Sequence, residues 1–436
     1  MLLRHSKGLS LLFMTEMWER FSFYAMRALL VLYMTARIFD GGLGWSRADA
    51  LRLYGIYLGT AYFTPVLGGY LSDCFLGQRR SAMIGAVMMA AGHFCMAFNE
   101  LWIFYTALAL IAIGNGFFKP CLTSILGQIY DDASESQRDS AYSLFYMGIN
   151  IGGAAAGVIS GWLLSLYGFD VGFTAAGVGM VVATLIFWWG KDKFLGEAGK
   201  KPSVKIRYHH VVPLSREEKR KLVVFGFLLI VTVFFIVSWE QIGGLITLFI
   251  EESVNRQIGR WVIPTPLIAN IDPFFIIFLA PMISAFWAYL GQRKRDPFLG
   301  TKMGLGCLFL ALSFVVLGVL STIADEGIQP HWGWIVLNKL FLVLGELCVI
   351  PISWAAVTRL APKSYISRVM GLMLAGIGFG SYLAGILGSY VDQVGTTLIF
   401  TGLTLELLIL GGLCFLVNPK LKELAHEYTD RESKIT

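Results

Sequence analysis

The chain is a succession of apolar stretches that are each long enough to cross a lipid bilayer, and this feature constrains its fold more than any other. A membrane-spanning helix needs about 20 consecutive, mostly apolar residues. Polar segments separate apolar runs over residues 9–38, 48–74, 81–98, 101–128, 139–167, 171–190, 222–250, 267–290, 302–323, 333–360, 367–391 and 395–417. With only 15% charged residues, these runs predict an all-α integral membrane protein with 12 transmembrane helices and exclude a soluble domain.

The runs form two groups of six, which predicts two six-helix bundles. The expected organisation is an N-terminal bundle over 1–190, a cytoplasmic basic linker over 191–221, a C-terminal bundle over 222–418 and a cytoplasmic tail over 419–436. The segment LGQRR at 76–80 recurs as LGQRK at 290–294, each time after the second helix of its half. Such a repeat is typical of the major-facilitator fold, in which two similar bundles enclose a site halfway across the membrane.

Basic residues predict how the helices are oriented in the membrane. The linker between the halves has ten Lys or Arg against four Asp or Glu, and an excess of Lys and Arg keeps short loops on the cytoplasmic side. We therefore expect a multi-pass protein of the plasma (inner) membrane with both termini in the cytoplasm. The formal net charge of +6 is then explained by the basic residues of the cytoplasmic loops. It does not indicate a nucleic-acid partner, and none is expected.

Charged residues inside the apolar runs are the main functional signal. A charge at the centre of a membrane helix costs about 2.5–3.5 kcal/mol on insertion scales, so such residues usually face a cavity or a partner. One face of the first run carries Glu16, Glu19, Arg20, Tyr24 and Arg27. Later runs carry Lys119, Glu240, Asp272, Lys339, Glu346 and Glu406. Unpaired carboxylates in a low dielectric tend to bind protons, whereas fixed cations attract an anionic substrate group. The pattern therefore predicts that proton binding is linked to substrate binding.

Three polar residues inside the apolar runs have ordinary structural interpretations. Lys339 lies within about two turns of its expected helix start, so we expect its ammonium group to reach the outer interface. For Glu406, a packing role and a solvated position away from lipid both stay open, and His93 is expected to be packed. We find no nucleophile with a base and no metal-ligand spacing, which argues against an enzyme, a metal site or a cofactor. Charges of mixed sign spread over several helices argue against a channel.

The motifs around these charges resemble those of the proton-dependent oligopeptide transporter family. Residues 16–24 (EMWERFSFY) resemble its ExxERFxYY signature, and residues 116–120 (GFFKP) resemble its Phe-Lys-Pro motif. Looser matches follow at 68–77, 145–150, 239–241, 345–347 and 383–385. The resemblance covers nearly the whole expected membrane region. It implies a symporter of the major-facilitator superfamily that takes up di- and tripeptides by alternating access, with protons as the coupling ion.

The resemblance also implies which residues contact the substrate. Arg20, Arg27 and Lys119 are similar to the cationic residues around the peptide carboxylate. Glu346 is similar to the acid that faces the peptide amino group, and Asn150 to an amide that reads the peptide backbone. The remaining candidates for the substrate site are Tyr24, Tyr62, Trp239, Glu240 and Asp272.

Proton coupling and gating follow from the same resemblance. Glu16 and Glu19 resemble the proton-coupling pair beside Arg20, and Glu240 resembles a further acid that takes part in coupling. Two gate pairs are implied, which alternate during transport: Arg27–Glu240 at the outer side and Lys119–Glu346 at the inner side.

Four positions depart from the family pattern and bear on the substrate: Phe23, Cys121, Asp272 and Met373. Asp272 stands where the family has Asn, and its carboxylate predicts a bias toward cationic ligands or another amine-bearing compound. The expected partners are a small peptide or peptide-like substrate and membrane lipid, and the expected form is a minimal bacterial transporter that functions as a monomer. The alternative is a proton-coupled transporter of the same family for a non-peptide solute, such as an amine-bearing drug, a nucleoside, an amino-acid derivative or nitrate.

Overall fold

The structure is a computed structural model that describes residues 7–98, 100–202, 214–362 and 365–426. Helices dominate it, because a chain inside a bilayer must satisfy its backbone hydrogen bonds internally. The first half contains α1 (Lys7–Thr35), η2 (Ile38–Asp40), α2 (Arg47–Leu71), η3 (Ser72–Leu76), α3 (Gln78–Cys95), α4 (Leu101–Ile129), α5 (Glu135–Tyr167) and α6 (Phe169–Phe194). Each predicted run of this half corresponds to one long helix.

Two apolar runs of the second half are not continuous helices. The seventh is divided by η4, which begins at Glu240, and by Gly244. The eighth is divided at Asn270 and Ile271, directly before Asp272. The elements of this half are α7 (Arg216–Trp239), η4 (Glu240–Gly243), α8 (Leu245–Ser253), the antiparallel pair β1 (Gln257–Ile258) and β2 (Trp261–Val262), α9 (Thr265–Ala269), α10 (Asp272–Gln292), α11 (Leu299–Asp325), α12 (Gly333–Leu360), α13 (Ile366–Gly388), α14 (Val391–Val394) and α15 (Thr396–His426).

Helices extend into the predicted linker and into the predicted tail. α6 continues to Phe194, and α7 begins after Ser215, whose side chain accepts a hydrogen bond from the backbone N–H of Glu218 in a capping box. The linker predicted over 191–221 therefore includes the end of one helix and the start of the next. α15 extends to His426, beyond the predicted tail boundary. Residues 203–213 and 427–436 lie outside the described residues.

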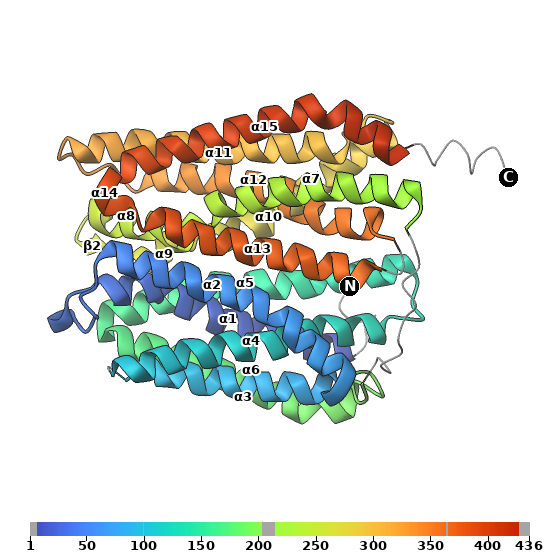
Figure 1. The fold of residues 1–436 in the computed structure, drawn as a ribbon. Coiled ribbons are helices and arrows are strands. Elements are labelled where there is room, and N and C mark those ends of the chain that lie inside the picture. Colours follow the sequence, from blue (N-terminus) through green and yellow to red (C-terminus); the bar gives the residue numbers. More distant parts are fainter. Residues whose placement is uncertain (1–6, 99, 203–213, 363–364, 427–436) are drawn as a thin grey trace.

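The helices of each half pack against one another, and the halves lie side by side. Figure 1 shows the first half, blue to green, below the second half, light green to red, with the long helices running in a common direction. In the first half α1 packs on α5 and α6, and α3 on α4; in the second, α11 packs on α12 and α15. The halves meet where α2 packs on α13 and where α5 packs on α9 and α10.

Glycines bring the two halves to backbone distance at these seams. A Cβ added to Gly55 in α2 would lie 2.6 Å from the Cα of Gly385 in α13. A Cβ added to Gly157 in α5 would lie 2.9 Å from the Cβ of Asn270, at the break before α10. Both distances are too short for a side chain, so these positions require glycine as long as the halves stay in contact.

The two halves are joined at one end of the molecule, which we call the Arg47 end. Arg47 begins α2 and forms ion pairs with Glu252 of α8 at 3.2 Å and with Asp392 of α14 at 2.7 Å. Toward the opposite end, which we call the Arg79 end, the part of α10 that follows Ile276 contains no buried residue. The seam between the halves is therefore closed at the Arg47 end, and α10 is exposed toward the Arg79 end.

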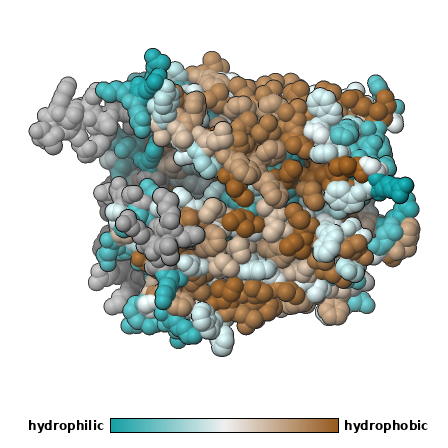
Figure 2. All heavy atoms as spheres, turned by 180° about the vertical axis from the view of Figure 1, so that it is seen from behind, coloured by the Kyte–Doolittle hydropathy of each residue, from teal (hydrophilic) through white to brown (hydrophobic). Residues whose placement is uncertain are grey.

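The surface is that of a membrane protein. Figure 2 shows hydrophobic side chains over the middle of one face and hydrophilic side chains gathered at both ends. Within the described residues, nine helical segments are long and apolar enough to cross a membrane. α1 is not one of them, because Glu16, Glu19, Arg20 and Arg27 interrupt its apolar sequence.

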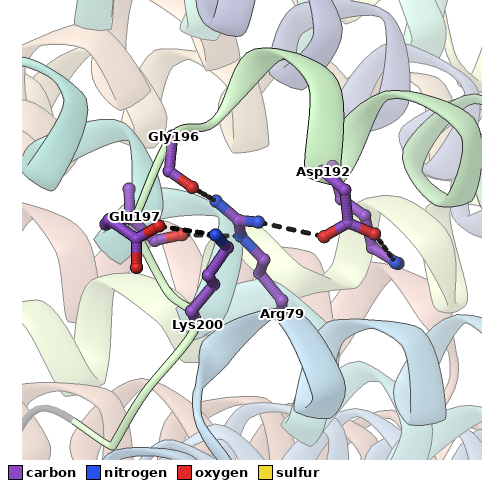
Figure 3. Close-up of polar contacts among 7 residues, drawn as sticks. Arg79, Asp192, Gly196, Glu197 and Lys200 are labelled. Atoms are coloured by element: carbon purple, nitrogen blue, oxygen red, sulfur yellow. Dashed lines mark hydrogen bonds and ion pairs between the residues drawn. The ribbon is translucent and has the colours of Figure 1, made fainter.

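Arg79 holds the loop after α6 against the start of α3 (Figure 3). Its Nε donates to the carbonyl of Ala198 and its Nη2 to the carbonyl of Gly196, both at 2.7 Å, and its Nη1 lies 3.2 Å from a carboxylate oxygen of Asp192. In the same loop Lys200 pairs with Glu197 at 2.5 Å. The chain that leaves the first half toward the linker therefore starts from a fixed position.

Candidate functional site

A cavity of about 300 Å³ lies between the two halves. One wall comes from α1, α2, α4 and α5, and the other from α7, η4, α9 to α10, α12 and α13. The sequence-predicted residues that line it are Glu16, Arg20, Tyr24, Arg27, Tyr62, Lys119, Asn150, Trp239, Asp272 and Glu346. Glu19 and Glu240 do not line the cavity but bind arginines that do. The structure thus brings all the predicted site residues together.

The charged face of α1 forms the centre of the first wall. Both carboxylate oxygens of Glu19 accept hydrogen bonds from the guanidinium of Arg20 at 2.5 Å, and Glu16 lies 3.6 Å from the same guanidinium. All three side chains are nearly inaccessible to solvent. The guanidinium also lies 4.8 Å from the ring centroid of Phe23, within the range of a cation–π contact. Arg20 is therefore held by two acids and an aromatic ring of its own helix.

Asn115 supports this cluster, and the sequence analysis did not include it. Its amide oxygen lies 3.4 Å from Nη2 of Arg20, and its Nδ2 donates to the carbonyl of Ala61 at 2.9 Å. Asn115 thereby links α1, α2 and α4. The available signal was an amide side chain between two glycines, Gly114 and Gly116, in an otherwise apolar run.

Arg27 joins the two halves next to the cavity. Its guanidinium forms an ion pair with Glu240 at the α7 break, and its Nε donates to the hydroxyl of Tyr54 at 2.7 Å. The pair matches the contact predicted for the outer gate. Tyr54 was missed, because a tyrosine in an apolar run carries no signal of its own.

Lys119 lies on the same wall without a carboxylate partner. Among the described residues, no ion pair includes its ammonium group, which lies 5.4 Å from the ring centroid of Tyr62. Gly116 brings α4 so close to α2 that a Cβ added to Gly68 would lie 2.2 Å from the carbonyl oxygen of Gly116. Lys119 is therefore placed on the cavity by close helix packing rather than by an ion pair.

The second wall carries the acids. One carboxylate oxygen of Glu346 accepts a hydrogen bond from Nε1 of Trp239 at 3.2 Å. Asp272 forms an ion pair with Lys339 at 3.3 Å, and Lys339 also donates to the carbonyl of Ala269 at 2.6 Å. The expectation that Lys339 reaches the outer interface is wrong, because its side chain is 0% exposed and points to Asp272.

Two further predictions concern the inner gate pair and Asn150. Lys119 and Glu346 line the same cavity, but no ion pair joins them within the described residues. The predicted inner pair is therefore not formed in this conformation, in which α10 is exposed toward the Arg79 end. Asn150 lines the cavity, while its Nδ2 donates to the carbonyl of Tyr146 in its own helix at 2.9 Å.

Glu406 and His93, which the sequence analysis did not assign to the substrate site, do not line the cavity. Glu406 of α15 is half-buried and lies 3.3 Å from the hydroxyl of Ser238, which donates to it. His93 is buried inside the first half. Within the described part of the chain, no three His, Cys, Asp or Glu side chains gather as a metal-binding group.

The cavity is therefore polarised between the two halves. Arg20, Arg27 and Lys119 place cations on the first wall, and Asp272 and Glu346 place acids on the second. An elongated molecule with an anionic end and a cationic end can contact both walls at once.

Comparison with known proteins agrees with this geometry. A sequence model described as the POT family matches residues 79–215 and 200–402. The peptide transporter YePEPT of Yersinia enterocolitica is 34% identical in an alignment that covers 89% of this chain and 89% of that protein.

Solved structures give the same result. A crystal structure of a peptide transporter POT in complex with sulfate matches with a TM-score of 0.91 and 28% identity, over 97% of this chain and 96% of that one. A POT family transporter in complex with 5-aminolevulinic acid matches with a TM-score of 0.89 and 25% identity, over 96% and 97% of the two chains. The predicted all-helical, twelve-helix major-facilitator fold is confirmed by these matches.

Proposed function

The chain belongs to the POT family and is a peptide transporter rather than an enzyme, and we propose that it takes up di- and tripeptides together with protons by alternating access. One observation carries the proposal. The cavity presents one unpaired charge on each wall, the ammonium of Lys119 on the first and the carboxylate of Glu346 on the second, within the described residues. A free peptide has a carboxylate at one end and an ammonium at the other, so the two walls can bind its two ends.

The size of the cavity supports small peptides. Its volume of about 300 Å³ lies at the lower limit of ligand pockets, which extend to about 1,000 Å³. Because the charged contacts address the peptide ends, we expect peptides of two or three residues with different side chains to be accepted.

Proton coupling is assigned to the acid cluster of α1. Both carboxylate oxygens of Glu19 bind one edge of the Arg20 guanidinium, formed by Nε and Nη2, so a carboxylate of the substrate and Glu19 compete for the same cation. When Glu19 takes up a proton, Arg20 becomes available to the substrate. Glu16 and Glu240 are assigned supporting roles in coupling, because each lies beside an arginine of the cavity.

The contacts between the halves support a cycle with two gates. In this conformation Arg27 and Glu240 are paired, and the Arg47 end is closed. Within the described part of the chain no ion pair joins Lys119 to Glu346, and α10 is exposed toward the Arg79 end. We therefore assign this conformation to the inward-facing state, in which a pair between Lys119 and Glu346 would close the inner side later in the cycle.

Orientation and assembly follow from the same proposal. Arg79, Lys191, Lys193 and Lys200 lie at the Arg79 end, and basic loops favour the cytoplasm. We place that end and both termini in the cytoplasm of a bacterial inner membrane. Both walls of the cavity belong to one chain, which supports a functional monomer.

A second candidate function is favoured by one relative. The POT family transporter in complex with 5-aminolevulinic acid shows that a member of the family binds a small molecule with an amine and a carboxylate that is not a peptide. The same pair of unpaired charges, on Lys119 and Glu346, suits such a compound.

Uptake into proteoliposomes separates the two functions. With an inwardly directed proton gradient, we expect radiolabelled dialanine to accumulate above its external concentration, and a protonophore to abolish this accumulation. Accumulation of 5-aminolevulinic acid without accumulation of dialanine would favour the second candidate. Peptide flux that is indifferent to the gradient would contradict proton coupling.

Close packing of α2 on α13 makes Gly55 a sensitive position. We expect Gly55→Leu to lower dialanine uptake about 5- to 100-fold, because overpacking costs about 1–3 kcal/mol and would act only in states where the Arg47 end is closed. The matched control is Gly402→Leu in α15, since a Cβ at Gly402 meets nothing within 4 Å. Gel filtration verifies that both variants fold. Wild-type uptake by folded Gly55→Leu would show that transport does not require close contact between α2 and α13, and would contradict this prediction.

A further inference from the structure

Lys339 is a buried charge to which the proposed transport cycle assigns no role. It lies on α12, seven residues before Glu346, a separation of about two helical turns that places both residues on one face of the helix. Its side chain is 0% exposed and does not line the cavity, whereas its partner Asp272 lines the cavity with a side chain that is 11% exposed. The ammonium group therefore lies behind Asp272 as seen from the substrate.

The contacts of Lys339 fix both its charge and its position. Its Nζ lies 3.3 Å from Oδ1 of Asp272 and donates to the carbonyl of Ala269 at 2.6 Å. Ala269 ends α9 and Asp272 begins α10, so the ammonium group spans the break between these two helices. Removing one member of a buried ion pair leaves the other charge uncompensated.

This pairing changes the electrostatics of the second wall. The carboxylate of Asp272 borders the cavity, but the ammonium behind it cancels its charge. Glu346 has no ion-pair partner among the described residues and accepts only the hydrogen bond from Trp239. The second wall then presents one effective negative charge, on Glu346. This charge can bind the amino end of a peptide, and no second negative charge on this wall is available to bind a cationic side chain.

We propose that Lys339 determines specificity by neutralising Asp272, so that the transporter does not select peptides with a cationic side chain. The proposal rests on the proposed function as a peptide transporter. The sequence analysis predicts a bias toward cationic ligands because it treats the carboxylate of Asp272 as an uncompensated charge. The pairing with Lys339 removes that reason. Lys339 acts through Asp272 and is a positioning residue that does not touch the substrate itself.

The test compares uptake of Ala-Lys, Ala-Ala and Ala-Glu in proteoliposomes as ratios of kcat/KM. In the wild type we expect the Ala-Lys to Ala-Ala ratio to lie within about threefold of one. Lys339→Gln leaves the carboxylate of Asp272 uncompensated, so that ratio should rise about tenfold and the Ala-Glu ratio should fall. Asp272→Asn leaves the ammonium of Lys339 uncompensated. The Ala-Lys to Ala-Ala ratio should then fall about tenfold, and the Ala-Glu to Ala-Ala ratio should rise about tenfold.

Controls separate specificity from damage to the fold. The double variant Lys339→Gln with Asp272→Asn should return both ratios to within about threefold of wild type, because neither charge remains. Lys302→Gln removes an ammonium that pairs with Asp296 at 2.7 Å away from the cavity, and it should leave the ratios unchanged. If Lys339→Gln does not fold, Asp272→Asn tests the proposal through its opposite shift.

Each result has a defined meaning. Single variants that transport Ala-Ala with unchanged ratios would overturn the role of Lys339 and leave the proposed peptide transport intact. Shifts of the same sign in both single variants would also overturn it. If the wild type transports none of the three dipeptides under a proton gradient, it is the proposed function that fails.

Discussion

Replacing Glu19 by Gln is expected to abolish proton-driven accumulation while leaving exchange of substrate across the membrane. Both carboxylate oxygens of Glu19 hold the Arg20 guanidinium, and an amide cannot bind and release a proton to free that cation. A gradient of one pH unit supplies about 1.4 kcal/mol per proton, or about tenfold accumulation for each coupled proton. In Glu19→Gln the ratio of internal to external dialanine should stay at one.

Counterflow distinguishes loss of coupling from loss of transport. Vesicles loaded with unlabelled dialanine should take up labelled dialanine through Glu19→Gln at a rate within about tenfold of wild type, because exchange requires no net proton movement. Glu406→Gln is the matched control, since this carboxyl group lies in α15 beside Ser238 and outside the cavity. It should retain full accumulation. Proton-driven accumulation by Glu19→Gln would remove Glu19 from the coupling role.

Replacing Lys119 by Gln is expected to weaken dialanine binding by about 10- to 100-fold. Lys119 is the cavity-lining cation that has no carboxylate partner within the described residues, so its ammonium group is free to bind the carboxylate of a peptide. A hydrogen bond to a charged group contributes about 1.5–3 kcal/mol, and each 1.4 kcal/mol changes affinity tenfold. Calorimetry on the purified protein measures the change directly.

A modified ligand identifies the group that Lys119 binds. Dialanine amide has no carboxylate, so Lys119→Gln should change its affinity less than about threefold, although the wild type binds it more weakly than dialanine. Lys302→Gln removes an equal charge outside the cavity and should affect neither ligand. Equal losses for dialanine and its amide in Lys119→Gln would show that the lysine contacts another part of the substrate.

Much of the site could be predicted because charges are rare inside membrane helices. The spacing of Glu16, Glu19, Arg20 and Arg27 places them on one face of α1, and the structure places that face at the cavity. Their positions follow from helical periodicity and from the cost of exposing a charge to lipid. The fold could be predicted from the apolar runs, because a segment that crosses the lipid must be apolar over most of its length.

What the sequence could not supply was the direction of single side chains and the state of the transporter. Distance from a helix end placed Lys339 near an interface, but its ammonium turns inward, because Asp272 and the carbonyl of Ala269 lie across from it. The predicted contact between Lys119 and Glu346 depends on which side of the transporter is closed. Asn115 and Tyr54 position arginines through hydrogen bonds between distant helices, which no local pattern reveals.

A structure of the protein with dialanine bound tests the central claim most directly. The polarised cavity predicts that the dipeptide lies between the halves, with its carboxylate within hydrogen-bonding distance of Lys119 Nζ and its amino group within that distance of Glu346. A dipeptide bound in the reverse direction, or outside this cavity, would contradict the account.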